Sequence, residues 1–95
     1  MDKRLIEKIE NYENGLNLVN QMQPVTFQKK GSNKKELGLV AQDIQYFEPL
    51  TVYMNKGLLI IEHDKLIPVL INAIKVLSKE VEELKNNNLK SKKMK

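Results

Sequence analysis

The strongest constraint on this fold is a stripe of apolar residues near the end of the chain. Six aliphatic side chains recur there at alternating spacings of three and four residues: Ile67, Leu70, Ile74, Leu77, Val81 and Leu84. That spacing places them along one side of an α-helix, as the a and d positions of a heptad repeat. We call these six residues the seam. The sequence predicts a long helix over residues 63–85 with its seam covered by a partner.

The residues around the seam change along this helix. In its first half, apolar residues also occupy other positions, such as Leu66, Val69 and Ala73, whereas charged residues surround the seam after Leu77. We therefore expect burial on several sides at first and along the narrow seam afterwards. Two interpretations stay open: a coiled coil between chains, or the core face of a monomer.

Residues at both ends of the predicted helix indicate where it begins and where it ends. Asp64 is the expected N-cap, because its carboxylate can accept hydrogen bonds from free N–H groups of the first turn. Pro68 falls so early that little hydrogen bonding is lost. The three asparagines that begin at Asn86 are expected to fray the helix, which leaves residues 86–95 as a disordered basic tail.

Composition excludes several classes of function. The chain has 95 residues, no cysteine and a single histidine, His63. One small domain is expected, without disulfides, thiolate chemistry, a metal site or a cofactor. No apolar run reaches the roughly 18 residues that cross a bilayer, and the start lacks the apolar region of a signal peptide. A soluble, cytosolic protein without a membrane partner is the expectation.

The basic charge suggests a second function. The formal net charge is +4, and Lys90, Lys92, Lys93 and Lys95 concentrate positive charge in the tail. The alternative is thus a basic coiled-coil oligomerisation module that contacts nucleic acid through this tail. A solvated end explains the same lysines more simply, so nucleic acid is not the expected partner.

The first two thirds of the chain predict short elements. Residues 2–9 form a short helix or an arm laid on a neighbour, and Leu16, Val19 and Met22 form the core face of a second short helix. Residues 25–28 and 36–40 read as one β-hairpin, and residues 51–54 and 57–61 as another. Between the hairpins, a helix is expected whose apolar face is Val40, Ile44 and Phe47. The fold class is α+β, with short helices and hairpins packed on the long C-terminal helix.

Several stretches in this order resemble a known family. They are Asp2-x-Arg4-Leu5, Glu13-Asn14-x-Leu16 leading to Gln23-Pro24-Val25-Thr26-Phe27, Gly38-Leu39-Val40-Ala41-Gln42-Asp43-Ile44 with Pro49, and Asp64-Lys65-Leu66-Ile67-Pro68-Val69-Leu70. Together they resemble the intramolecular chaperone auto-processing domain, the peptidase S74 domain at the C-terminus of bacteriophage tailspikes and tail fibres and in myelin regulatory factor-like proteins. The residues of this chain that match the motifs of the family are Pro24, Phe27, Gly38, Ala41, Gln42, Asp43, Pro49 and Asp64. Without the family, Gln42 and Asp43 read as helix caps.

The resemblance implies a function in assembly. Such domains form homotrimers that hold an upstream fibre or β-structured segment of the same precursor in register while it folds. The domain would cover residues 1–85, with the seam as the trimer interface, and would act in the host cytoplasm during virion assembly, or stay with the virion if uncut. Family members are released by self-cleavage at the domain's N-terminus.

The catalytic positions of the family are not matched here. The resemblance implies a serine at the first position and a lysine five residues later that accepts its proton. This chain has Met1 and Ile6 there, which supply neither group. The sequence therefore predicts a chain without this self-cleaving activity, in which Met1 stands where the serine would be.

The number of helices in the predicted coiled coil is open to two interpretations. Ile67, Ile74 and Val81 at a with leucines at d favour two parallel strands, whereas the resemblance implies three. Glu80 at a g position and Lys85 at the following e position can pair between parallel neighbours. We expect a parallel, three-stranded coiled coil, because the globular part should add contacts beyond the seam.

The alignment of Met1 and Ile6 can be tested by restoring the missing groups. In a fusion with an upstream segment, Met1→Ser combined with Ile6→Lys is expected to cut the chain directly before residue 1, because it supplies the nucleophile and its base. A gel and the mass of the released fragment report the cut. A fusion with Ile6→Lys alone is the control and should remain whole. An uncut double variant would contradict the alignment.

Overall fold

The computed structural model describes the backbone of residues 1–93 and the side chains as far as Asn88. The elements follow in this order: η1 (Lys3–Leu5), α1 (Gly15–Gln21), β1 (Val25–Phe27), β2 (Glu36–Gly38), α2 (Ala41–Phe47), η2 (Pro49–Thr51), β3 (Val52–Asn55), β4 (Leu58–Ile61), η3 (His63–Lys65) and α3 (Leu66–Lys93), where η marks a short 3-10 helix. The α+β fold and the long C-terminal helix predicted from the sequence are confirmed.

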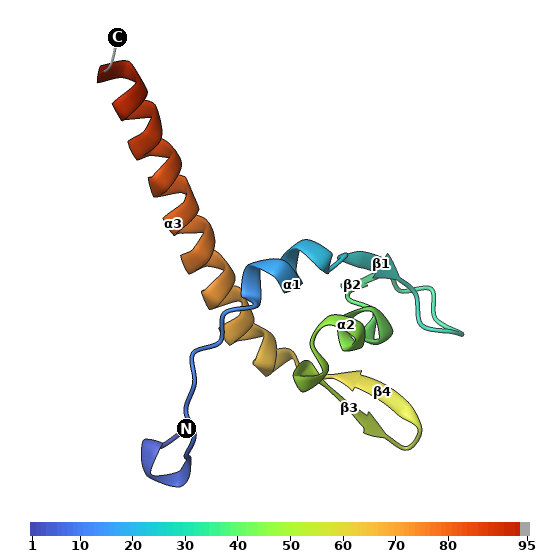
Figure 1. Ribbon diagram of the computed structural model, residues 1–95. Coiled ribbons are helices and arrows are strands. Elements are labelled where there is room, and N and C mark those ends of the chain that lie inside the picture. Colours follow the sequence, from blue (N-terminus) through green and yellow to red (C-terminus); the bar gives the residue numbers. More distant parts are fainter. Residues whose placement is uncertain (94–95) are drawn as a thin grey trace.

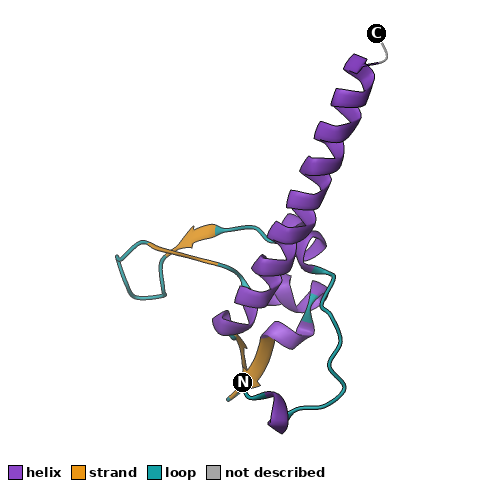
Figure 2. Cartoon of the chain, turned by 90° about the vertical axis from the view of Figure 1, so that its left-hand side faces the viewer, coloured by secondary structure: helices purple, strands orange, loops and turns teal. Residues whose placement is uncertain are grey.

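The molecule is elongated because α3 projects away from everything else. Its extents are 64 × 43 × 21 Å. In Figure 1, α1, α2 and both hairpins gather on one side of the first half of α3, and the N-terminal arm, residues 1–11, lies on the other side. Figure 2 shows the remainder of α3 as a single rod that leaves this cluster.

Both predicted hairpins form, each as a separate two-stranded antiparallel sheet. In the first, Val25 pairs with Gly38 and Phe27 with Glu36. In the second, Val52 pairs with Ile61 and Asn55 with Leu58. The second turn uses Lys56 and Gly57, both with positive φ, as tight two-residue hairpin turns require.

The core lies between α1 and the first half of α3. Leu18 of α1 is fully buried, and Leu66, Val69 and Ala73 bury the facing side of α3. The two helices approach very closely at Gly15, where an added Cβ atom would lie 2.4 Å from the Val69 carbonyl oxygen and 2.7 Å from the Ala73 nitrogen. Only a residue without a side chain fits this contact.

A second part of the core is built around α2. Ile44 is buried, whereas Val40 and Phe47, predicted to share its face, remain more than a third exposed. At the end of α2, the Thr51 hydroxyl donates to the Glu48 carbonyl oxygen at 2.8 Å. The Glu48 carboxylate accepts from the Leu50 N–H at 3.2 Å, which caps η2.

Several details of the prediction were wrong. The buried residue of α1 is Leu18, whereas Leu16, Val19 and Met22 are half-buried. The reason is that Gly15 begins the helix, so the face that starts there continues through Leu18. At the N-terminus, where a short helix or an arm was predicted, Lys3–Leu5 is helical and the other residues of 1–11 form an exposed arm that bends at Lys8.

The ends of the long helix also differ from expectation. Asp64 lies inside η3, where Glu62 is the N-cap, and within the described residues no backbone N–H donates to the Asp64 carboxylate. The helix continues past Asn86 to Lys93, where fraying and a disordered tail were expected. Once a helix has formed, each further residue adds a hydrogen bond, while asparagine costs only about 0.7 kcal/mol relative to alanine. Met94 and Lys95, the end of the expected tail, lie outside the described residues.

No helix within residues 1–93 combines the length and the apolar character that are needed to cross a bilayer.

The close contact of α1 with α3 predicts that Gly15→Ala destabilises the fold. The new methyl group would overlap backbone atoms of α3, which cannot rotate away as a side chain can. We expect a loss of about 1–3 kcal/mol in the free energy of unfolding. Urea unfolding at a fixed protein concentration measures it.

Asn20→Ala, at an exposed position of the same helix, is the matched control and should change stability by less than about 0.5 kcal/mol. Equal stability of the Gly15 variant and this control would contradict the packing described here.

Candidate functional site: an uncovered helix interface

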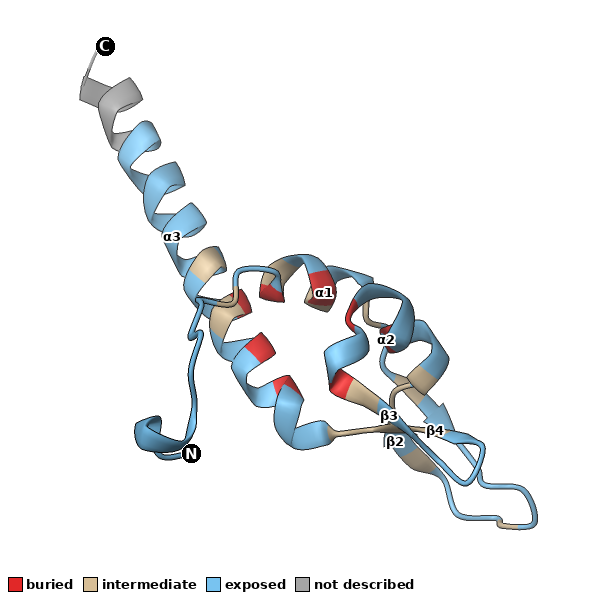
Figure 3. Cartoon of the chain, turned by 60° about the horizontal axis from the view of Figure 1, so that its bottom comes forward, coloured by how far each residue is buried: buried red, intermediate tan, exposed pale blue. Residues whose placement is uncertain are grey.

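The seam of α3 is uncovered in the single chain. Each of its six aliphatic side chains keeps between 42% and 67% of its surface exposed. In Figure 3 the buried positions of α3 are confined to its first turns, and the helix is exposed from Leu77 to Asn88. The seam is therefore not the core face of this subunit, which was the alternative interpretation of its spacing.

Two apolar faces thus run side by side along α3. A helix turns by about 100° per residue, so Leu66, Val69 and Ala73 occupy one sector and the seam occupies the next sector around the axis. The first face is covered by α1, whereas the second has no partner within the described residues. From Leu77 to Asn88 every residue is exposed, so this length of helix touches no other part of the subunit.

The apolar face of this helix lacks the packing that usually stabilises a helix. Isolated helices of about 12–15 residues are marginal in water, and most helix stability in proteins comes from packing of an apolar face. Exposed aliphatic residues in one continuous row mark an interaction surface. The seam is therefore the candidate functional site, as a continuous apolar surface of the kind at which protein chains associate.

An apolar hollow adjoins the seam at its N-terminal end. It has a volume of ≈ 470 Å³ and is lined mainly by apolar side chains, among them Val19 of α1, Met22 directly after α1, Leu37 of β2, and Leu66 and Leu70 of α3. Leu70 belongs both to the seam and to this hollow. The uncovered apolar surface therefore extends from α3 onto the globular part.

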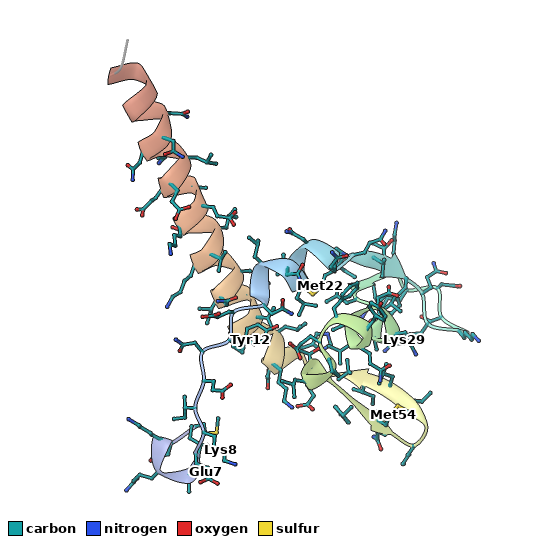
Figure 4. All side chains as sticks on the ribbon, viewed as in Figure 1. Glu7, Lys8, Tyr12, Met22, Lys29 and Met54 are labelled. Atoms are coloured by element: carbon teal, nitrogen blue, oxygen red, sulfur yellow. The ribbon has the colours of Figure 1, made fainter. Side chains whose placement is uncertain are left out.

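The base of the N-terminal arm is fastened on the opposite side of α3. The Tyr12 hydroxyl donates to a carboxylate oxygen of Glu48 at 2.9 Å, and the Gly15 N–H donates to Oδ1 of Asn72 at 2.7 Å. Glu48 is only 8% exposed, so this hydrogen bond holds a nearly buried carboxylate. In Figure 4 Tyr12 lies at the base of the arm beside α3, whereas Glu7 and Lys8 lie farther out along the arm.

The environment of Tyr12 changes its acidity. Partial burial disfavours the phenolate, and the Glu48 carboxylate accepts the hydroxyl proton in a hydrogen bond and repels a second negative charge nearby. Together these effects raise the pKa of Tyr12 to about 12. The hydroxyl is therefore a stable donor throughout the neutral range.

The family-motif residues serve the fold rather than a common site. The Phe27 ring lies over Gly38, where an added Cβ atom would be 3.0 Å from ring atom Cε1. Pro24 precedes β1 and contributes to the hollow. The remaining motif residues lie as follows: Ala41, Gln42 and Asp43 form the first turn of α2, Pro49 begins η2, and Asp64 lies in η3.

The expected capping by Gln42 and Asp43 is not observed. Val40 is the N-cap residue of α2, and the helix start has no side-chain cap hydrogen bond. Asp43 still lies in the first turn, where its negative charge favours the positive end of the helix dipole.

The two positions that correspond to the family's catalytic pair lie in the arm. Met1 is fully exposed and Ile6 is partly exposed. Between them, the Asp2 carboxylate and the Arg4 guanidinium form an ion pair of 2.8 Å on the surface. The side chains of Met1 and Ile6 offer no nucleophile and no base. The described residues contain no group of three or more His, Asp or Glu that could hold a metal ion.

Sequence reasoning missed the residues that orient the arm and α1. Tyr12, Asn72 and Gly15 carried no periodic signal, because each acts through one contact with a distant element. Asn14-Gly15 is the one local signal in this region, and it marks the start of α1.

Comparison with known proteins identifies the class to which the fold belongs. The fold and this site define a small α+β domain with an incomplete helical interface. A family model described as peptidase S74, chaperone of endosialidase, matches residues 2–53, and the chain belongs to this family. A search among curated proteins found no match.

The match covers more than half of the chain and confirms the resemblance seen in the sequence motifs. It ends at Tyr53, so the motif from Asp64 onward and the seam lie outside it. The family is therefore defined by the arm, α1, the first hairpin and α2, whereas the evidence for the interface comes from the exposure of α3.

The hydrogen bond between Tyr12 and Glu48 predicts a pH-dependent contribution to stability. Tyr12→Phe removes the donor, so we expect the free energy of unfolding to fall by about 1–3 kcal/mol at neutral pH. Because the folded state raises the pKa of Tyr12 from 10.0 to about 12, the contribution is complete below about pH 10 and is lost as the pH rises through about 12.

Urea unfolding of the wild type and the variant across this range measures the difference. Tyr46→Phe, at a position that is 84% exposed, is the control and should show almost no effect at any pH. A Tyr12 effect that stays constant up to pH 12 would contradict the assignment.

Proposed function

We propose that this chain is an assembly domain that forms a parallel homotrimer through the seam of α3. In this role it holds an upstream, fibre-type segment of the same precursor in register while that segment folds. Membership of the chaperone of endosialidase family supports the assembly role. The single observation that carries the proposal is the row of six uncovered aliphatic side chains along α3.

The seam has enough apolar surface to drive association. Burial of one aliphatic side chain stabilises by roughly 1.5–3 kcal/mol, so six side chains contribute about 9–18 kcal/mol per chain before costs. Ordering of side chains and loss of overall motion remove much of this sum. We expect the remainder to support association at micromolar concentration.

Three strands fit the apolar surface better than two. Ile and Val at a with Leu at d favour a dimer in a simple coiled coil. However, Ile71 at an e position is 51% exposed and widens the apolar face beyond the seam. A wider face can contact two neighbours at once, and the hollow beside Leu70 adds surface that a two-helix contact would leave uncovered.

Trimerisation would act on folding through effective concentration. When three chains are tethered, the encounter of their upstream segments becomes intramolecular, with an effective concentration in the millimolar range for short flexible connections. Long-range β pairing is slow because loop-closure entropy must be overcome before contacts form. In a parallel trimer the three N-terminal arms would leave at the same end of the bundle, which aligns the segments that precede them.

The proposal predicts that one charge in the seam dissociates the assembly. Ile74→Asp places a carboxylate at an a position in all three chains, where burial of the charge would outweigh the remaining apolar contacts. We expect light scattering at micromolar concentration to give three chains per particle for the wild type and one for the variant. In a fused precursor the upstream segment should then fail to fold.

Asn86→Asp introduces the same residue at an exposed f position of the same helix and is the matched control; it should remain trimeric. Single wild-type chains at this concentration, or a trimer of the Ile74 variant, would refute the proposed function.

A further inference from the structure

The N-terminal arm carries apolar side chains that nothing in the subunit covers. All of residues 1–11 are exposed, and Leu5 and Ile9 keep 83% and 61% of their surfaces in contact with solvent. The arm nevertheless has a fixed origin, because the hydrogen bonds of Tyr12 and Gly15 fasten its base to α2 and α3. It is thus a positioned apolar segment without a binding site of its own.

The hollow beside the seam is an apolar binding site without an occupant. Val19, Met22, Leu37, Leu66 and Leu70 contribute to its lining, and the lining is almost entirely apolar. It lies on the flank of α3 that carries Leu66, next to α1 and the first hairpin. The arm starts on the opposite flank, where Tyr12 borders Pro68, Ile71 and Lys75. Figure 1 shows these two sides of α3.

Cyclic symmetry brings the two features together. When three parallel helices meet along their seams, each chain contacts one neighbour with one flank and the other neighbour with the opposite flank. The arm flank of each chain therefore faces the hollow flank of the next chain. Both features also lie toward the N-terminal end of α3, because the hollow is lined by Leu66 and Leu70 and the base of the arm borders Pro68 and Ile71, so they meet at the same level of the bundle.

We propose that in the assembled trimer the arm of each chain, through Leu5 and Ile9, packs into the hollow of the next chain. This inference rests on the proposed trimer and identifies a second interface within it. The partner is the arm of a second copy, and the contact is continuous with the seam through Leu70. Each arm would then bind the next subunit in the same direction around the three-fold axis.

Reach excludes the chain's own arm as the occupant at Ile9. Ile9 lies three positions before the fastened Tyr12, and a fully extended chain spans at most about 3.6 Å per position, or about 11 Å in all. The path from one flank of α3 to the other passes around a helix about 10–12 Å in diameter. Ile9 therefore reaches a neighbour's hollow more readily than its own.

Disulfide trapping between two different chains tests the proposal. The chain has no cysteine, so single engineered cysteines give an unambiguous result. Ile9→Cys and Leu37→Cys are each placed in a separate full-length chain, both at exposed positions, and the two chains are co-expressed. Any disulfide between these positions must join two chains. Each variant expressed alone gives the background of like-with-like disulfides.

A matched pair and a seam control complete the experiment. Tyr46→Cys, on the exposed surface of α2, replaces Leu37→Cys in the control pair. Ile74→Cys reports contact across the seam, and light scattering reports the number of chains per particle. We expect trimers, a seam disulfide, and a disulfide between positions 9 and 37 at least about tenfold more abundant than between positions 9 and 46.

The outcomes separate the two proposals. Trimers with a seam disulfide but no excess of the 9–37 pair would overturn arm exchange and leave the proposed function standing. Single chains without a seam disulfide would overturn the proposed function, and arm exchange with it. Trimers with the selective 9–37 disulfide support both.

Discussion

The close packing of α1 against the first half of α3 is the contact on which the rest of this structure depends. It needs Gly15, because a side chain there would overlap the backbone of α3, and it buries Leu18 completely. This contact covers one apolar face of α3 and leaves the adjacent face open. It also fixes where the N-terminal arm begins, since Gly15 donates to Asn72 of α3.

A single helix therefore presents two apolar faces with different surroundings. Leu66, Val69 and Ala73 pack against the rest of the subunit, whereas the seam stays exposed. The first face ends at the half-buried Val76, and every residue from Leu77 to Asn88 is exposed as the helix leaves the globular part. Such a division lets a small domain keep a core of its own and still present a long apolar row to partners, which is the arrangement that an assembly domain requires.

The accuracy of the sequence prediction depended on the range of the interactions involved. Both hairpins were predicted because their turn residues and β-prone runs are local signals, and α3 was predicted because its apolar repeat extends over many turns. The core face of α1 was misassigned, because only a close approach to α3 makes Gly15 part of that face. Tyr12 and Glu48 meet across 36 positions of sequence, which no local pattern reports.

The amino-acid sequence by itself determined the elements, the family motifs and the existence of an apolar row along the last helix, because these follow from backbone preferences and residue spacing. Only the tertiary structure decided that this row is uncovered. The reason is competition between faces: the spacing of Ile67 and Leu70 fits a core as well as an interface, and the choice is made by the neighbouring face that α1 occupies. The position of the arm opposite the hollow was likewise settled by tertiary contacts, through Tyr12 and Asn72.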